Sequence, residues 1–335
     1  MPSKKYFIKV FGCQMNVADA EKVSEWYEQK GWERTDKAEE ADEAVVVTCS
    51  VRQTAEDRVY GQVNNLSKLK NQNHKLKIVL TGCMMRYPLR WLKEKMSQVD
   101  EFRKISDYPQ KKIGKINPDS PALIPIMEGC NNFCSYCVVP YARGREISRP
   151  IEEIVCEVEG LAKRGYKEIL LLGQNVNSFK PSFTSLLVRL HEIEGIEKLS
   201  FLTSNPWDLD DEIIEAMSLP KIDRHLHLPV QSGDDEILKR MNRHYTATDY
   251  LKLVKKIKKK IPDIEIGTDI IVGFPGETEE QFQHTLNLCK KVGFVKAYVS
   301  MYSPRLQTAA YKFKDDVPLK EKRRRWKILD SLINQ

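Results

Sequence analysis

The chain has 335 residues, enough for one large or two medium-sized domains with sizeable cores. Lysine and arginine outnumber aspartate and glutamate by 54 to 47, a formal charge of +7 that favours a polyanionic partner without requiring one. These features argue against a membrane or secreted class, because no apolar run is long enough to cross a bilayer and MPSKKYFIKVFGC lacks the apolar segment of a secretory leader. We therefore expect a cytoplasmic protein with no membrane partner, whose eight cysteines are metal ligands or buried thiols rather than disulfides.

Three short β-branched runs in the first third of the chain each end in a cysteine. They are YFIKVFGC, AVVVTC and KIVLTGC, which end at Cys13, Cys49 and Cys83. Each run is typical of a buried strand and precedes a helical pattern, and the spacings of 36 and 34 residues suit one strand and one helix. We predict parallel strands whose carboxyl ends bring the three thiols to one edge of an open α/β sheet, where such sheets bind ligands. The alternative is that each cysteine is simply buried at the end of its strand.

The helix after the first of these strands carries signals at both ends. Asn16 and Asp19 resemble an N-cap and its capping-box partner, and Gly31 is a natural residue for ending the helix. The sequence thus predicts a helix from about residue 16 to about residue 30.

A boundary between two domains is predicted at residues 106–121, where SDYPQKKIGKINPDSP combines prolines and polar residues without apolar periodicity. Residues 1–115 then form the first domain and residues 120–335 the second. From residue 122 onward, short apolar runs alternate about six times with helical patterns, which predicts a partial (β/α)6 barrel with its chemistry at the carboxyl ends of the strands. The predicted strands are ALIPIME, EILLLG, KLSFLT, RHLHLPV, IEIGTDIIVGF and VKAYVSMYS.

A second group of cysteines, Cys130, Cys134 and Cys137 in EGCNNFCSYC, follows the first predicted strand of this barrel. Three thiolates are one ligand fewer than a closed metal site normally takes, and no cysteine follows before Cys156. A four-iron cluster held by three cysteines keeps one iron open for a substrate. We interpret Cys156 and Cys289, which fall within amphipathic patterns, as core or inert thiols.

Motifs along the whole chain resemble those of the radical S-adenosylmethionine methylthiotransferase family. GCQMNVADAEKV, VVVTCSVRQTAEDRVYGQ and TGCMMR resemble the family's N-terminal domain. IMEGCNNFCSYCVVPYARGREISRP, LLGQNVNSF, HLPVQSGDDEILKRMNR, TDIIVGFPGETEE and YSPR are similar to its catalytic domain. The resemblance extends from about residue 5 to about residue 330.

The resemblance implies two 4Fe–4S clusters with different roles. Cys130, Cys134 and Cys137 would hold a cluster whose open iron binds S-adenosylmethionine, which is cleaved to a 5′-deoxyadenosyl radical. At Cys13, Cys49 and Cys83, a second, auxiliary cluster would hold or donate sulfur. A second S-adenosylmethionine would methylate that sulfur, and the substrate radical would then capture the methylthio group.

The GCQMN element resembles the branch that acts on carbon 2 of N6-isopentenyladenosine at position 37 of tRNA. The branches that act on threonylcarbamoyladenosine or on a ribosomal protein aspartate remain alternatives. A different class also remains, a non-catalytic RNA-binding protein whose cysteines hold zinc or an iron–sulfur cluster. The resemblance implies a reductant such as flavodoxin or ferredoxin, and the sequence identifies neither this electron donor nor the sulfur donor.

Five further residues are candidates for contacts with S-adenosylmethionine or the substrate, Tyr136 by its resemblance to the family and four others by their position. Tyr136 precedes the last cysteine of the triplet, and Gln174, Asn175, Ser204 and Gln231 follow predicted strands of the barrel. The alternative for these four polar residues is that they cap loops and helices. GFPGET likewise predicts a tight turn from strand to helix, for which structure alone could explain the glycines.

Binding of the tRNA anticodon loop is the least complete part of the sequence evidence. Family members generally carry a small β-barrel RNA-binding domain, called TRAM, after the catalytic domain, and we expect none before Gln335. LKLVKKIKKK, and KEKRRRWK with Trp326 among its cations, could contact phosphates and stack on a base. The alternative is that both are amphipathic helices with solvated basic faces.

Overall fold

The computed structural model describes residues 3–108 and 120–335, and the chain divides into two compact units. Unit 1 comprises Met1–Ile116 and Tyr141–Gly144, and unit 2 comprises Asn117–Pro140 and Arg145–Gln335. Most of the predicted boundary, residues 109–119, lies outside the described residues. Residues Tyr141–Gly144, which come after the second cysteine group, belong to unit 1, and the sequence gives no sign of this.

Unit 1 contains a five-stranded, wholly parallel sheet in the order β2-β1-β3-β4-β5. Its strands are β1 (Lys5–Val10), β2 (Glu33–Arg34), β3 (Glu43–Thr48), β4 (Lys77–Gly82) and β5 (Glu101–Phe102). Its α-helices are α1 (Gln14–Gln29), α2 (Gln53–Leu69) and the shorter α3 (Leu89–Lys95). The predicted open parallel sheet is confirmed.

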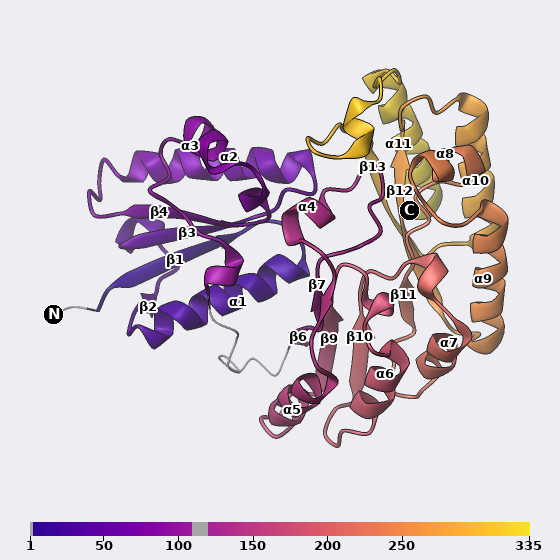
Figure 1. Ribbon diagram of the computed structural model, residues 1–335, viewed down its shortest axis with the longest axis horizontal. Coiled ribbons are helices and arrows are strands. Elements are labelled where there is room, and N and C mark those ends of the chain that lie inside the picture. Colours follow the sequence, from indigo (N-terminus) through magenta and orange to yellow (C-terminus); the bar gives the residue numbers. More distant parts are fainter. Residues whose placement is uncertain (1–2, 109–119) are drawn as a thin grey trace. The chain divides into compact units, whose positions relative to one another are not determined.

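Helices cover both faces of this sheet (Figure 1). Val46 of β3 packs in the same core as α2 and α3, whereas its neighbours Val45 and Val47 pack in the core on the side of α1. Successive side chains of a strand point to opposite faces, so a strand covered on both sides needs an unbroken apolar run. That requirement explains the sequence AVVVT in β3.

The predicted start of α1 is wrong, whereas its predicted end is confirmed. Cys13 occupies the N-cap position without a side-chain capping bond, and Asn16 lies inside the helix. The Asn16 amide instead donates to the carbonyl oxygens of Phe11, at 2.7 Å, and Thr48, at 2.8 Å. Gly31, with φ of +76°, follows the last turn in the left-handed conformation that glycine adopts without strain.

Unit 2 is a partial barrel of six parallel strands with helices on its outside (Figure 1). One sheet has the order β10-β9-β6 and another β11-β12-β13, and a parallel bridge between Leu199 and Ile222 links β10 to the segment before β11. The barrel strands are β6 (Ala122–Pro125), β9 (Glu168–Leu172), β10 (Lys198–Phe201), β11 (His225–His227), β12 (Glu265–Val272) and β13 (Lys296–Met301). A separate antiparallel pair is formed by β7 (Met127–Glu128) and β8 (Ile147–Ser148). The predicted partial (β/α)6 barrel is confirmed.

Most helices of unit 2 begin at short polar side chains that cap them. Ser182, Asp210, Asp234, Thr246 and Thr278 each accept a hydrogen bond from a backbone N–H in the first turn. The helices are α5 (Ile151–Ala162), α6 (Phe183–His191), α7 (Asp211–Met217), α8 (Asp235–Arg240), α9 (Ala247–Lys260), α10 (Glu279–Val292) and α11 (Leu319–Ile333), while the short α4 (Val139–Arg143) is divided between the units.

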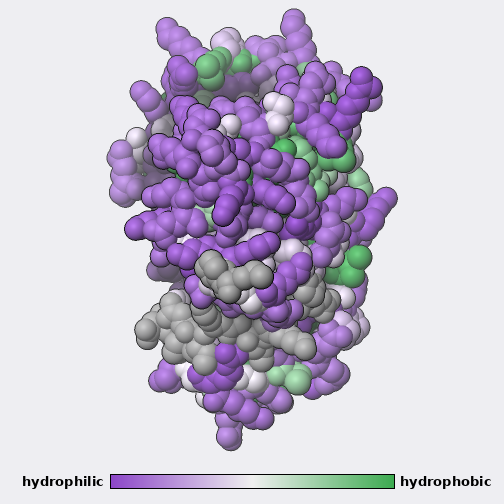
Figure 2. All heavy atoms as spheres, turned by 90° about the vertical axis from the view of Figure 1, so that its left-hand side faces the viewer, coloured by the Kyte–Doolittle hydropathy of each residue, from purple (hydrophilic) through white to green (hydrophobic). Residues whose placement is uncertain are grey.

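The surface seen in Figure 2 is mostly hydrophilic, with a few separate hydrophobic side chains. Within residues 3–108 and 120–335, we find no helix with both the length and the apolar character needed to cross a membrane.

Candidate functional site

The three cysteines of unit 1 lie where three parallel strands end. Cys13 follows β1, Cys49 follows β3 and Cys83 follows β4. The Sγ atoms of Cys13 and Cys83 lie 3.6 Å and 3.9 Å from the same atom, Asn16 Oδ1, and Cys49 interacts electrostatically with both other thiols. The structure therefore brings the three thiols together at one edge of the sheet. Their role as cluster ligands stays a prediction.

A glycine allows Cys13 and Cys49 to approach each other. Gly12 has φ of +120°, and a Cβ atom on it would lie 2.7 Å from Cys49 Cβ and 3.1 Å from Cys49 Sγ. No Cβ fits at this distance from another carbon atom, and the φ value strains any other residue. The glycine of GCQMN therefore has a local structural cause.

We expect Gly12→Ala to disturb the Cys49 thiol and to reduce iron binding at unit 1. The variant should be destabilised by about 1–3 kcal/mol because of its backbone strain and the displaced cysteine. The matched control is Gly61→Ala within α2, where nothing lies within 4 Å of the new Cβ. Chemical denaturation and iron analysis of both variants test this, and equal iron content in both would contradict it.

A buried polar network joins the loops that carry Cys49 and Cys83. The Arg86 Nε atom donates to Ser50 Oγ at 2.6 Å, and its guanidinium lies 3.8 Å from the Glu56 carboxylate. The Tyr87 hydroxyl donates to Glu56 at 3.1 Å. Because each buried polar group has a partner, the network holds the two loops in one arrangement.

The cysteine loop of unit 2 is held by the last residue of α8 and the residues that follow it. The Ser135 N–H donates to the Met241 carbonyl at 2.9 Å, and its hydroxyl donates to the Arg240 carbonyl at 2.8 Å. The Asn242 amide donates to the Phe133 carbonyl at 3.2 Å. Phe133 itself has φ of +46°, so the loop keeps a strained conformation that these bonds stabilise.

Arg243 contacts the cysteine triplet, although the sequence does not single it out. Its Nη1 atom donates to Cys134 Sγ at 3.5 Å, and its Nη2 atom donates to the Pro229 carbonyl at 2.8 Å. The guanidinium also lies 4.7 Å from the centre of the Trp207 ring. Arg243 thus places a positive charge beside one thiol of the triplet.

Burial makes these thiols unfavourable as isolated anions. It raises the pKa of Cys83 to about 11, that of Cys130 to about 11 and that of Cys137 to about 12, and neighbouring thiols contribute to each rise. Buried thiolates therefore need a cation to compensate their charge, which the iron of a bound cluster would supply.

The thiols are not arranged around a single metal ion. Within residues 3–108 and 120–335, no three His, Cys, Asp or Glu side chains lie close enough together to hold one ion. Each cysteine of a four-iron cluster binds a different iron, so its ligands stand farther apart than those of one zinc ion. The donor set, three thiols per site, suits such a cluster with one open iron.

Of the five other residues predicted to contact a ligand, Gln174 and Asn175 form hydrogen bonds within the protein. The carbonyl oxygen of the Gln174 side chain accepts from the Gly129 N–H at 2.6 Å, and Asn175 bonds to Asn205 at 2.6 Å. Gln174 thus supports the cysteine loop, whereas Asn175 bonds to other polar side chains, Asn205 and Asp208, and makes no side-chain capping bond. The role of Asn175 as a ligand contact stays a prediction. Tyr136 lies half-buried between Cys134 and Cys137, and burial, then Cys134, raises its pKa.

Ser204 and Gln231 are buried, and each has one polar side-chain atom that forms no hydrogen bond with any described residue. The Ser204 hydroxyl and the Gln231 side-chain carbonyl oxygen have no hydrogen-bond partner within the described residues. Gln231 also has φ of +66°, and its backbone is fixed by bonds to Asp269 and Ile271 of β12. Such groups are costly unless a ligand pairs them, so both residues fit a polar ligand such as S-adenosylmethionine.

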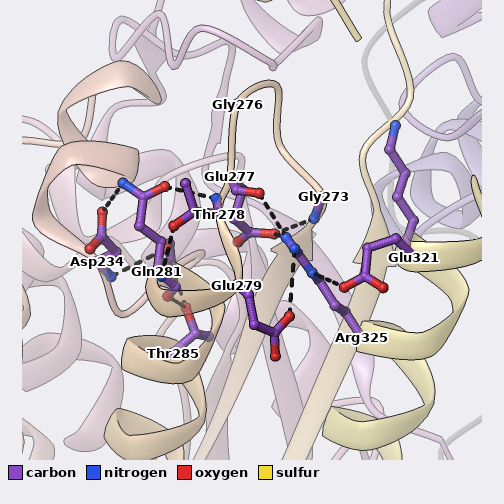
Figure 3. Close-up of polar contacts among 12 residues, drawn as sticks. Asp234, Gly273, Gly276, Glu277, Thr278, Glu279, Gln281, Thr285, Glu321 and Arg325 are labelled. Carbon is purple, nitrogen blue, oxygen red and sulfur yellow. Dashed lines mark hydrogen bonds and ion pairs between the residues drawn. The ribbon is translucent and has the colours of Figure 1, made fainter. Parts of the chain in front are cut away.

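The GFPGET turn between β12 and α10 serves the fold. The Gly273 N–H donates to the Glu277 carboxylate at 2.6 Å, and Arg325 of α11 donates to the same carboxylate at 2.7 Å (Figure 3). The Gly276 N–H donates to Asp316 at 2.7 Å. The backbone donors of this turn thus bind the protein's own carboxylates, and the structural alternative holds.

This contact also corrects the predicted basic patch at the C-terminus. Arg325 is 5% exposed, and the Trp326 Nε1 atom donates to the Val299 carbonyl at 2.9 Å. Burial of Arg325 favours the alternative of an amphipathic helix at this position, whereas Trp326 is half-buried and its contact with RNA stays a prediction. Arg324 is exposed but pairs with Glu279 and Glu321.

Two known families match separate parts of the chain. Residues 124–289 match the radical SAM superfamily, and residues 5–103 match the uncharacterized protein family UPF0004. The first match covers most of unit 2 and includes the triplet at Cys130, and the second covers the cysteines of unit 1.

Curated proteins match nearly the whole chain. The tRNA-2-methylthio-N(6)-dimethylallyladenosine synthase of Dehalococcoides mccartyi is 46% identical over 98% of this chain and 82% of its own length. The protein of the same name from Clostridium botulinum is 44% identical over 99% of this chain and 82% of its own length. Among solved structures, the radical S-adenosylmethionine methyltransferase TsrM of Kitasatospora setae matches with a TM-score of 0.65 at 14% identity, over 89% of this chain and 75% of its own. The last match shows the fold alone.

Proposed function

The chain belongs to the radical S-adenosylmethionine methylthiotransferase family, and we propose that it transfers a methylthio group to carbon 2 of N6-isopentenyladenosine at position 37 of tRNA. The observation that carries the proposal is the presence of two groups of three thiols, each gathered within its own unit. One group alone would suit many radical enzymes, whereas the second suits an enzyme that inserts sulfur.

In this proposal, residues 120–335 form the catalytic domain and residues 1–115 the auxiliary-cluster domain. Cys130, Cys134 and Cys137 would hold the cluster that binds S-adenosylmethionine, and Cys13, Cys49 and Cys83 the auxiliary cluster. When bound, these groups supply a 5′-deoxyadenosyl radical that removes hydrogen from carbon 2 of the adenine, and a sulfur atom that is methylated and transferred.

The remaining site residues would hold and orient S-adenosylmethionine. Ser204 and Gln231 offer a hydroxyl and a carbonyl oxygen that have no other partner among the described residues. Tyr136 interacts electrostatically with the last two cysteines and packs against the core cluster that contains Phe274, and its ring would contact the adenine of the ligand. Gln174 would act indirectly rather than by touching the ligand. It accepts a hydrogen bond from the Gly129 backbone and so holds the start of the cysteine loop in place.

One observation favours this function over a zinc-binding RNA protein. Ser204 and Gln231 each have a buried polar atom without a partner among the described residues, which suits a bound small molecule. We further propose that the enzyme acts in the cytoplasm and takes electrons from a flavodoxin or ferredoxin.

We propose that exposed lysines of α9 contribute to tRNA binding. Lys252, Lys255 and Lys259 are exposed, whereas Lys256 and Lys260 pair with Asp211 and Glu215 of α7. Replacing the first three by Gln should reduce the slope of log affinity against log salt by about 0.7–0.9 for each phosphate that is no longer neutralised. The Lys256→Gln, Lys260→Gln variant is the control. A slope unchanged in the triple variant would remove α9 from the tRNA surface.

The acceptor is tested by nucleoside mass spectrometry of tRNA from cells with and without this protein. We expect methylthiolated isopentenyladenosine only in cells that contain it. A change confined to threonylcarbamoyladenosine, or to the mass of a ribosomal protein, would assign the chain to another branch of the family.

A further inference from the structure

Arg143 lies against the cysteines of unit 1, although it follows Cys137 by six residues in the chain. Its Nε atom donates to Cys83 Sγ at 3.3 Å. Its Nη2 atom donates to Asn16 Oδ1 at 3.0 Å and to Asp19 Oδ2 at 2.5 Å. One guanidinium therefore reaches a thiol, an amide and a carboxylate at once.

The contact from Arg143 is of a kind that persists when Cys83 binds iron. The contacts between Asn16 Oδ1 and the thiols of Cys13 and Cys83 require S–H donors, and a cysteine loses that proton when it ligates a metal. Arg143 supplies the proton of its own hydrogen bond and stays charged, so its bond to a thiolate becomes charge-assisted. Arg143 is thus suited to the metal-bound state.

Burial preserves the electrostatic effect of the Arg143 charge on Cys83. The side chains of Arg143 and Asp19 are only 7% and 5% exposed, so water and salt screen their interactions weakly. Hydrogen bonds to the sulfur ligands and nearby charge are the factors that set the reduction potential of an iron–sulfur cluster. A cation next to Cys83 stabilises the reduced cluster, which carries one more negative charge, whereas Asp19 opposes that effect.

We propose that Arg143 is a positioning residue that raises the reduction potential of the auxiliary cluster through Cys83, and that Asp19 limits this rise. The proposal rests on the proposed function, because it places a cluster at Cys13, Cys49 and Cys83. The alternative is that the Arg143–Asp19 pair only fastens the end of α4 within unit 1. The two roles differ in their effects, since loss of a fastening should shift the potential in the same direction in variants of either residue, whereas loss of opposite charges should shift it in opposite directions.

The test uses the full chain with Cys130, Cys134 and Cys137 replaced by Ala, so that only the auxiliary cluster assembles. Its midpoint potential is measured by electron paramagnetic resonance during a redox titration. We expect Arg143→Gln to lower the potential and Asp19→Asn to raise it. The control is Arg58→Gln, which removes an exposed positive charge from α2 and should leave the potential unchanged.

Iron content separates the two ways in which these proposals can fail. If the triple variant binds no cluster, the proposed function and this inference both fall. If it binds a four-iron cluster whose potential is the same in all variants, or shifts in the same direction in Arg143→Gln and Asp19→Asn, only the inference is overturned. Should Arg143→Gln lose its cluster, Arg143→Lys replaces it in the test: a potential closer to that of the wild type than to that of Asp19→Asn supports the proposal, and a shift equal to that of Asp19→Asn contradicts it.

Discussion

Replacing Cys13, Cys49 or Cys83 by Ala is expected to abolish methylthiolation while sparing cleavage of S-adenosylmethionine. The reconstituted wild-type protein should hold about eight irons per chain and each variant about four, because one of two four-iron clusters is lost. Formation of 5′-deoxyadenosine should continue, since the cysteines that bind S-adenosylmethionine lie in the other unit. Iron analysis and chromatography of both nucleosides measure the two effects.

Cys156→Ala is the matched control for this experiment. Cys156 is exposed on α5, so it is not a core thiol and its interpretation as an inert thiol remains, whereas Cys289 is buried. The control should keep its iron and its activity. A wild-type protein with about four irons, or a Cys49→Ala variant that still transfers the methylthio group, would show that unit 1 holds no functional cluster.

Arg325→Ala is expected to destabilise unit 2 by about 3–5 kcal/mol, because it leaves the Glu277 carboxylate buried without its cation. The Arg325 and Glu277 side chains are 5% and 1% exposed, and burial raises the pKa of Glu277 while Arg325 opposes that rise. Loss of Arg325 should therefore also favour the protonated carboxyl. Denaturant unfolding measures the change in free energy.

Arg323→Ala provides the control, because Arg323 is exposed on the same helix and should change stability by at most about 0.5 kcal/mol. Affinity for tRNA should be unchanged in both variants while they remain folded. Equal stability of the two variants would contradict the structural role assigned to Arg325. A selective loss of tRNA binding in Arg325→Ala would restore it to the RNA surface.

The strands and most helices could be predicted because their signals are local. A strand covered on both faces must be apolar throughout, as β3 is, and helix α10 begins at a capping box formed by Thr278 and Gln281. The convergence of Cys13, Cys49 and Cys83 also follows, since parallel strands end at one edge.

Contacts between distant residues could not be predicted in this way. Asn16 looks like an N-cap from its neighbours, but its amide bonds to Thr48, 32 residues away. Arg143 meets Cys83 across 60 residues, and Arg243 meets Cys134 across 109. No periodic pattern in the sequence indicates that these residues are in contact. Both arginines nevertheless fall within motifs that resemble the family, since Arg143 immediately precedes GREISRP and Arg243 ends MNR.

The central claim is tested most directly by incubating the reconstituted enzyme with tRNA that carries isopentenyladenosine and with S-adenosylmethionine whose methyl group is deuterated. Mass spectrometry of the nucleosides should then show isopentenyladenosine that has gained one sulfur and one deuterated methyl group, with 5′-deoxyadenosine as the coproduct. Unmodified isopentenyladenosine together with 5′-deoxyadenosine would contradict the claim, because the radical would then form without any transfer of sulfur.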